Sequence, residues 1–145
     1  MSTIADVLGN KGHTIVSILP TETVHDAARL LTLRRIGAVV VRDRRGKLVG
    51  ILSERDIVRA IADRGEDALE EKVEDFMTKE VKTCQPKDSI KDLMQMMTIR
   101  RHRHVPVCNE LGDLVGIVSI GDVVKARLDE QAHEVAVLRD LTLVK

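Results

Sequence analysis

Gly50-Ile-Leu-Ser-Glu-Arg-Asp56 returns as Gly116-Ile-Val-Ser-Ile-Gly-Asp122, 66 positions later in a chain of 145 residues. The similarity extends well beyond this motif: residues 20–60 align with residues 86–126 without a gap, and 16 of the 41 aligned pairs are identical. A segment of that length is too small to bury a hydrophobic core alone. We therefore expect two copies that share a core and are related by a pseudo-two-fold axis, with a cleft between them.

Each copy is predicted to form a strand, a helix, two strands and a second helix. In the first copy a β-branched run at residues 14–18 precedes apolar residues at helical spacing, and the same order recurs 66 positions later. Aliphatic pairs of strands follow each helix and turn at Gly46 and Gly112. Sheets made of such apolar strands need helices to cover them. The fold class predicted is α/β, of the α+β type.

The repeats are expected to span residues 8–65 and 73–130, leaving residues 131–145 as a C-terminal helix. Residues 64–79 carry apolar side chains at helical spacing between many acidic ones and are predicted to be a short amphipathic connector. The tail carries an apolar stripe of Leu128, Ala132, Val135 and Leu138. The stripe packs either on its own domain or on a second copy of the chain, and we favour a homodimer.

The amino-acid composition argues against two classes of binding partner, nucleic acids and membranes. Basic and acidic residues number 23 each, so the net charge is zero, and Phe76 is the sole aromatic residue. Nucleic acid is therefore not an expected partner, because neither an overall field nor a stacking platform is present. The sequence contains no apolar run of membrane-spanning length, so we expect no membrane association and a cytoplasmic protein. Cys84 and Cys108 occupy non-equivalent positions and are predicted to be buried thiols in preference to a disulfide.

The paired Gly-x-x-Ser-x-x-Asp motifs, with Arg103-His-Val-Pro-Val107 before the second, resemble the signature of cystathionine-β-synthase (CBS) domains. Two such repeats resemble one Bateman module, and the resemblance covers residues 1–127, including a short helix before each repeat at residues 4–8 and 73–77. One copy of the motif would be weak evidence, whereas two copies in the same register are specific.

The Ser-x-x-Asp part of the motif has two interpretations. It is the pattern of a capping box that starts the last helix of each repeat. A helix N-terminus also offers free N–H groups to an anion, and a carboxylate beside it can accept hydrogen bonds from a vicinal diol such as a ribose. The resemblance implies that Asp56 and Asp122 hold ribose hydroxyls, with Ser53 and Ser119 near the ribose or phosphate.

The resemblance also implies the remaining ligand contacts. Adenine would be recognised beside the first strand of each repeat, by Thr14, Ile15, Val16 and Ala38 for one cleft and by Val81, Lys82, Thr83 and Pro106 for the other. Phosphate would be met by Arg103 and His104 at the Asp56 site and by Arg55 at the Asp122 site. Lys82 stands where the first repeat has Val16, which predicts that the two sites differ in affinity or ligand.

Catalytic machinery is not expected. Ser53 and Ser119 have no histidine positioned by the motif, and Cys84 has no neighbouring base. His102 and His104 could share one face of a strand, but they have no third ligand at useful spacing, so no metal is required.

We therefore expect a regulatory module that binds an adenine nucleotide (AMP first, then ADP, ATP or NAD(H)) and passes the signal to a dimer or to an unidentified protein partner. S-adenosylmethionine is disfavoured by its positive charge beside Arg103. The alternative is a dimerisation scaffold whose clefts stay empty.

Overall fold

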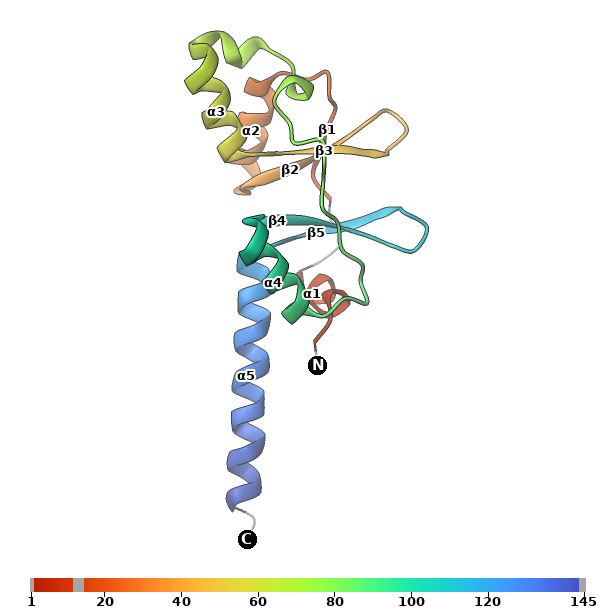
Figure 1. Cartoon of the computed structure of the whole chain (residues 1–145), viewed down its shortest axis with the longest axis vertical. Helices are drawn as coiled ribbons and strands as arrows, with labels where there is room; N and C mark the ends of the chain where they lie inside the picture. The colour runs from red at the N-terminus through yellow and green to blue at the C-terminus, as the bar shows by residue number, and fades with distance from the viewer. Residues whose placement is uncertain (1, 12–14, 144–145) are drawn as a thin grey trace. The chain divides into compact units, whose positions relative to one another are not determined.

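The structure, a computed structural model, describes residues 2–11 and 15–143 (Figure 1). The chain divides into two compact units. The first-repeat unit is made of residues 14–82, and the second-repeat unit joins residues 1–13 to residues 83–145. Helices and strands alternate in both, which confirms the mixed α/β class predicted from the sequence.

The first-repeat unit has the predicted element order: β1 (Ser17–Ile18), α2 (Val24–Arg34), β2 (Ala38–Arg42), β3 (Leu48–Ser53) and α3 (Glu54–Arg64). Strand β1 pairs in parallel with β2, which pairs antiparallel with β3. The first strand is shorter than the expected residues 14–18, because only Ser17 and Ile18 pair with Val40 and Val41. Thr14 lies outside the described residues.

The second-repeat unit contains α1 (Ile4–Lys11), α4 (Ile90–Arg100), β4 (His104–Cys108), β5 (Leu114–Ser119) and α5 (Ile120–Leu143). Its predicted first strand is reduced to a parallel bridge between Cys84 and Val107, which is the counterpart of the Ile18–Val41 pair. The hairpin of β4 and β5 matches that of β2 and β3, down to a register shift near its turn.

Both hairpins turn through the same local chemistry. Gly46 and Gly112 each have a φ of 84°, in the left-handed region that favours glycine. The Asp43 carboxylate accepts hydrogen bonds from the backbone N–H groups of Arg45 and Lys47, each at 2.9 Å. Asn109 does the same in the second hairpin. The different side chains thus specify one turn geometry in both repeats.

The first helix of each repeat begins where the capping pattern predicted. The Thr23 hydroxyl accepts from the Asp26 N–H at 3.0 Å, and the Asp26 carboxylate accepts from the Thr23 N–H at 3.1 Å. The latter hydrogen bond lowers the pKa of Asp26. Ser89 caps α4 by accepting from the Asp92 N–H at 3.1 Å.

Helices cover the sheet of each unit and enclose an aliphatic core. In the first-repeat unit α2 and α3 lie on one side of the sheet (Figure 1). Its buried core consists of Ile18, Val24, Ala27, Leu31, Val39, Val41, Leu52, Ile57 and Val73. The core of the second-repeat unit is built by Ile4, Val7, Leu8, Cys84, Ile90, Leu93, Met97, Val105, Val107, Val118 and Val123.

Each core also contains a leading segment, residues 4–8 or residues 73–77, which precedes one repeat and packs on the other. The Ile4 and Ala5 N–H groups donate to the carbonyls of Asp88 and Pro86, at 2.9 and 2.8 Å. The Val73 and Glu74 N–H groups make the same two bonds to Glu22 and Pro20, at 2.8 and 3.0 Å. The compact units therefore cross the repeat boundaries drawn on the sequence.

The connector is built from two 3₁₀ turns, η1 (Gly65–Glu70) and η2 (Val73–Asp75), and η2 stands where a short helix was expected at residues 73–77. Two hydrogen bonds to the start of α2 explain why no longer helix forms here. The Val24 N–H donates to the Glu71 carbonyl at 2.9 Å, and the Val73 N–H donates to the Glu22 carbonyl at 2.8 Å. Residues bound to another segment cannot continue an intrahelical hydrogen-bond ladder.

The motif glycines are the points at which the leading segments meet the sheets. A Cβ atom on Gly50 would lie 2.6 Å from Met77 Sδ and 3.0 Å from the Thr78 carbonyl oxygen. A Cβ atom on Gly116 would lie 2.7 Å from Leu8 Cδ2. Glycine is required at these positions by packing, since a methyl group would displace the covering segment.

We expect Gly50→Ala to lower the free energy of unfolding by about 2–3 kcal/mol and Gly116→Ala by about 1 kcal/mol. The difference arises because Gly50 faces a backbone carbonyl, whereas Gly116 faces the flexible end of a leucine side chain. Urea unfolding of the two variants measures both values, and an equal cost would refute the proposed difference between the contacts.

Both cysteines are free thiols, Cys84 buried and Cys108 half-buried. Burial raises the pKa of Cys84 to about 12, and the neighbouring Asp88 carboxylate adds to the increase. Burial also raises the pKa of Cys108. The thiolate is the reactive form, so both groups are less nucleophilic in the folded protein than in the unfolded chain.

At pH 8 we expect iodoacetamide to alkylate Cys108 first and Cys84 at least about a hundredfold more slowly than in the unfolded chain, since little Cys84 thiolate exists far below its pKa. The rate should rise as the pH approaches 12. Mass spectrometry of quenched time points distinguishes the two sites. Equal rates in folded and unfolded protein would contradict the burial of Cys84.

Candidate functional site

Ser53 and Asp56 form a compact hydrogen-bonded pair at the junction of β3 and α3. The Asp56 Oδ2 atom accepts from the Ser53 N–H at 2.9 Å and from the Ser53 hydroxyl at 3.1 Å, while the Asp56 N–H donates to Ser53 Oγ at 3.3 Å. The side chain of Asp56 is only 7% exposed. A buried carboxylate is stable there because the hydrogen bonds and the positive end of the helix dipole replace its hydration.

Ser119 and Asp122 repeat this arrangement between β5 and α5. The Ser119 N–H donates to Asp122 Oδ2 at 2.9 Å, and the Asp122 N–H donates to Ser119 Oγ at 3.1 Å. The side chains are half-buried. The capping interpretation of both motifs is therefore correct, and each unit also presents a carboxylate at a helix N-terminus.

The predicted adenine contacts are distributed over both units. Ala38 is buried and lies opposite Ser53 in the β2–β3 pair. Pro106 is buried in β4, and its carbonyl accepts from the Cys84 N–H at 3.0 Å. Outside the strands, Ile15, Val16 and Val81 are half-buried, whereas Lys82 and Thr83 are exposed.

The predicted phosphate contacts also belong to different units. Arg55 is exposed in the first turn of α3, next to Asp56. Arg103 is exposed just before β4, and its carbonyl accepts from the Ile120 N–H at 2.8 Å. His104 is half-buried and lies opposite Ser119 in the β4–β5 pair. Within its own unit each cation therefore lies close in sequence or register to a Ser-Asp pair.

Arg59 is a neighbour of the candidate site that sequence reasoning missed. Its Nη1 atom lies 3.8 Å from Asp56 Oδ1, the oxygen of the carboxylate that Ser53 does not bind. The signal was available, because residues three apart in a helix lie on the same face. Lys125 occupies the corresponding position after Asp122, so both motif aspartates are followed by a cation at this spacing.

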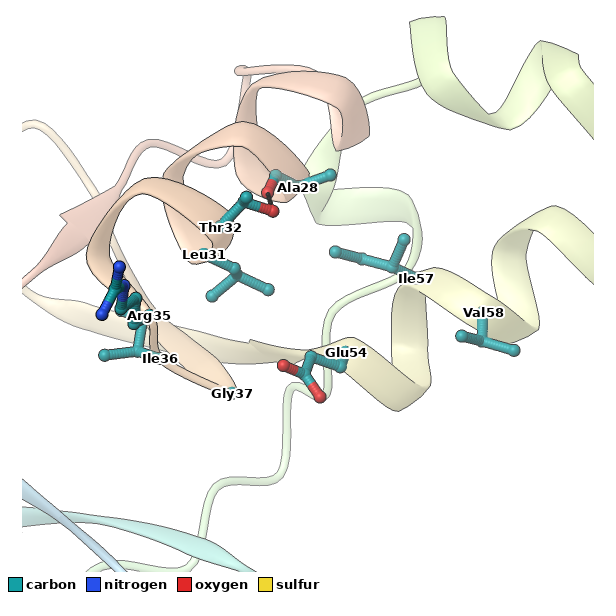
Figure 2. A pocket seen from close by; sticks show the side chains of 9 residues that line it. All are labelled: Ala28, Leu31, Thr32, Arg35, Ile36, Gly37, Glu54, Ile57 and Val58. Carbon is teal, nitrogen blue, oxygen red and sulfur yellow. Dashed lines mark hydrogen bonds between the residues drawn. The ribbon is translucent and has the colours of Figure 1, made fainter.

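A separate hollow of about 520 Å³ opens between the end of α2 and the start of α3 (Figure 2). Its lining is mainly apolar, and Arg35 and Glu54 lie on its two sides (Figure 2). The predicted ligand residues do not line it, although Gly37 and Glu54 are the sequence neighbours of Ala38 and Ser53. The hollow is therefore distinct from the Ser53–Asp56 pair.

Residues 2–11 and 15–143 lack both a cluster of metal ligands and a membrane-spanning helix. This part of the chain contains no group of three His, Cys, Asp or Glu side chains arranged to hold a metal ion. It also contains no helix with the length and apolar character needed to cross a membrane.

Comparison with known proteins identifies the repeats. The family model of the CBS domain matches residues 5–63 and 73–129. The mitochondrial CBS domain-containing protein CBSX3 of Arabidopsis thaliana is 38% identical over 141 residues, which cover 92% of this chain and 68% of that protein. A CBS-domain-containing protein of Agrobacterium tumefaciens has a crystal structure that is 45% identical, with a TM-score of 0.84 over 87% of this chain and 99% of its own.

Two further solved structures contain adenosine compounds. A CBS domain protein of Pyrobaculum aerophilum complexed with AMP is 30% identical, with a TM-score of 0.75 over 83% of this chain and 89% of its own. The CBS domain pair of MJ0100, in complex with 5′-methylthioadenosine and S-adenosyl-L-methionine, is 25% identical, with a TM-score of 0.77 over 86% of this chain and 98% of its own. The repeated motif, the paired units and these similarities show that this chain belongs to the CBS-domain family as a tandem, or Bateman, module.

Proposed function

We propose that this protein is a regulatory module that binds an adenine nucleotide, with AMP the first candidate and ADP, ATP and NAD(H) the others. Binding favours one arrangement of a homodimer over another, and an unidentified partner protein responds to that arrangement. A ligand has this effect only if it binds the two arrangements with different affinities.

The Ser53–Asp56 pair carries the proposal. Asp56 Oδ2 accepts hydrogen bonds from Ser53, whereas Asp56 Oδ1 lies 3.8 Å from the Arg59 guanidinium. An ionised carboxylate accepts about four hydrogen bonds in all, so Asp56 retains capacity for the hydroxyls of a ribose. The same residue types recur at Ser119 and Asp122. A motif that only capped a helix would not need its carboxylate buried, as the exposed Asp26 of α2 demonstrates.

The nature of the base is supported by the related structures. AMP, 5′-methylthioadenosine and S-adenosyl-L-methionine have adenosine in common, and they occur in CBS pairs that resemble this chain. The exposed Arg55 and Arg103, with His104, are the proposed contacts of a phosphate group. Phosphate complements these cations better than the sulfonium of S-adenosylmethionine does, which ranks AMP above it.

A homodimer is supported by apolar side chains that are exposed at equivalent positions of the two units. Leu33 and Ile99, at the ends of α2 and α4, are 78% and 80% exposed. Val58 of α3 and its counterpart Val124 of α5 are 66% and 39% exposed. Large apolar side chains that recur on one kind of surface are typical of an interface.

The loss of stability on replacing a capping serine distinguishes helix capping alone from stabilisation of the buried Asp56 carboxylate. We expect Ser89→Ala, beside the exposed Asp92, to lower the free energy of unfolding by about 1 kcal/mol. Ser53→Ala should cost about 2 kcal/mol, because the buried Asp56 carboxylate also loses a hydrogen bond. Chemical denaturation compares the two variants. An equal cost would show that the hydroxyl does not stabilise the buried carboxylate.

Ligand binding is tested by thermal unfolding with AMP, ADP, ATP, NAD, NADH and S-adenosylmethionine. AMP at 100 times its dissociation constant should add about 2.7 kcal/mol of apparent stability. Asp56→Ala or Asp122→Ala should abolish or reduce this gain, measured against each variant without ligand. The matched controls are Asp26→Ala and Asp92→Ala, which alter the same position of α2 and α4 and should retain the response.

A response lost equally in the control variants would contradict binding at the motif aspartates. A protein that is free of copurified nucleotide and responds to no compound would favour the dimerisation scaffold.

A further inference from the structure

Helix α5 continues for several turns beyond the body of its unit and exposes an apolar stripe there. Residues 131–140 are all exposed, including Val135 at 54% and Leu138 at 64%, and Leu128 before them is 60% exposed. In Figure 1 this part of α5 extends past α1 and α4, the other helices of the second-repeat unit. The sequence left open whether the stripe packs on its own domain or on a second copy. Leu128, Val135 and Leu138 do not pack on their own domain.

The side of α5 that contacts its own unit is a different one. Val123 is fully buried, and Glu130 is held by the Arg127 guanidinium at 3.1 Å and by the Ser2 N–H at 3.4 Å. At 3.6 residues per turn, these residues lie on roughly the opposite side of the helix from Leu128 and Val135. Docking of α5 on its unit therefore leaves the stripe pointing outward.

The exposed part of α5 from Leu128 onward fits a heptad pattern in which apolar and polar residues share the a and d positions. Leu128, Gln131, Val135, Leu138 and Thr142 are separated alternately by three and four residues, which are the a and d positions of a two-stranded coiled coil. Among parallel coiled coils, Val135 at an a position with Leu138 at a d position is the combination that favours two strands.

Charge complementarity identifies the partner and its direction. Glu134 and Arg139 fall at g and e positions, which face each other across a parallel in-register pair. Neither has an opposite charge three or four residues away along its own helix, so neither is served by an intrahelical pair. In an antiparallel pair g positions face g positions and e positions face e positions, so Glu134 would not meet Arg139 of the other copy.

We propose that residues 128–142 pair with the same segment of a second copy as a parallel coiled coil, with Glu134 bound to Arg139 of the other helix. This inference gives a geometry to the homodimer and rests on that part of the proposed function. Two heptads are too short to associate strongly by themselves, so the segment sets the orientation of two modules that also meet elsewhere.

Disulfide trapping tests the register in the full-length chain. Gln131→Cys should form a covalent dimer under mild oxidation, because d positions of a parallel pair face each other. In an antiparallel pair that matches Gln131 with Thr142, the two copies of residue 131 would lie about 16 Å apart along the axis. A disulfide needs Cα atoms within about 7 Å, so that pair could not be crosslinked. Val137→Cys, on the opposite side of α5, and the unaltered chain are the controls and should remain uncrosslinked.

A charge exchange tests the partner. Glu134→Arg should slow crosslinking of Gln131→Cys at least about tenfold, and adding Arg139→Glu should restore it. Crosslinking no faster than in Val137→Cys, no effect of Glu134→Arg, or no rescue by the exchange would each overturn the proposal.

The thermal response to AMP, measured on the same Gln131→Cys protein, separates the two hypotheses. Failure to crosslink with an intact response contradicts only the coiled coil, and crosslinking without a response contradicts only nucleotide binding.

Discussion

The close approach of each leading segment to the sheet of the opposite repeat is the constraint on which the rest of the structure depends. Gly50 and Gly116 allow it, because a methyl group at either position would come within 2.7 Å of the covering side chain. The segments then complete both cores and pair with the turns that start α2 and α4. Neither unit therefore has a complete core without the segment that precedes the other repeat.

In the proposed function, the Ser-Asp pairs combine helix capping with ligand binding in the same atoms. Ser53 and Asp56 begin α3 by satisfying helix N–H groups, and in doing so they hold a carboxylate in a fixed orientation beside the helix N-terminus. Fixing it in the folded protein spares the cost of ordering it when a ligand arrives. A ligand that engages this carboxylate also contacts the junction of β3 and α3, which lets binding alter the stability of the unit as a whole.

Helix α5 connects the Ser119–Asp122 pair to the exposed apolar stripe. It begins at Ile120, beside the Ser119–Asp122 pair, docks through Val123 and Glu130, and then continues as an exposed helix. A continuous helix transmits a displacement at one end to the other because its hydrogen-bond ladder resists bending. The proposed ligand site and the proposed dimer contact therefore lie on one rigid element.

The sequence by itself determined the repeat, the order of the elements, the caps and the hairpin turns, because these depend on interactions between residues close in the chain. It also identified Ser53, Asp56, Ser119 and Asp122, since capping geometry is local, and helical spacing would have added Arg59. Only the tertiary structure decided which repeat each leading segment covers, why Gly50 cannot carry a side chain, and that the first strands shrink to Ser17–Ile18 and a single bridge at Cys84. These outcomes depend on contacts between segments tens of residues apart, for which one sequence carries no periodicity to follow.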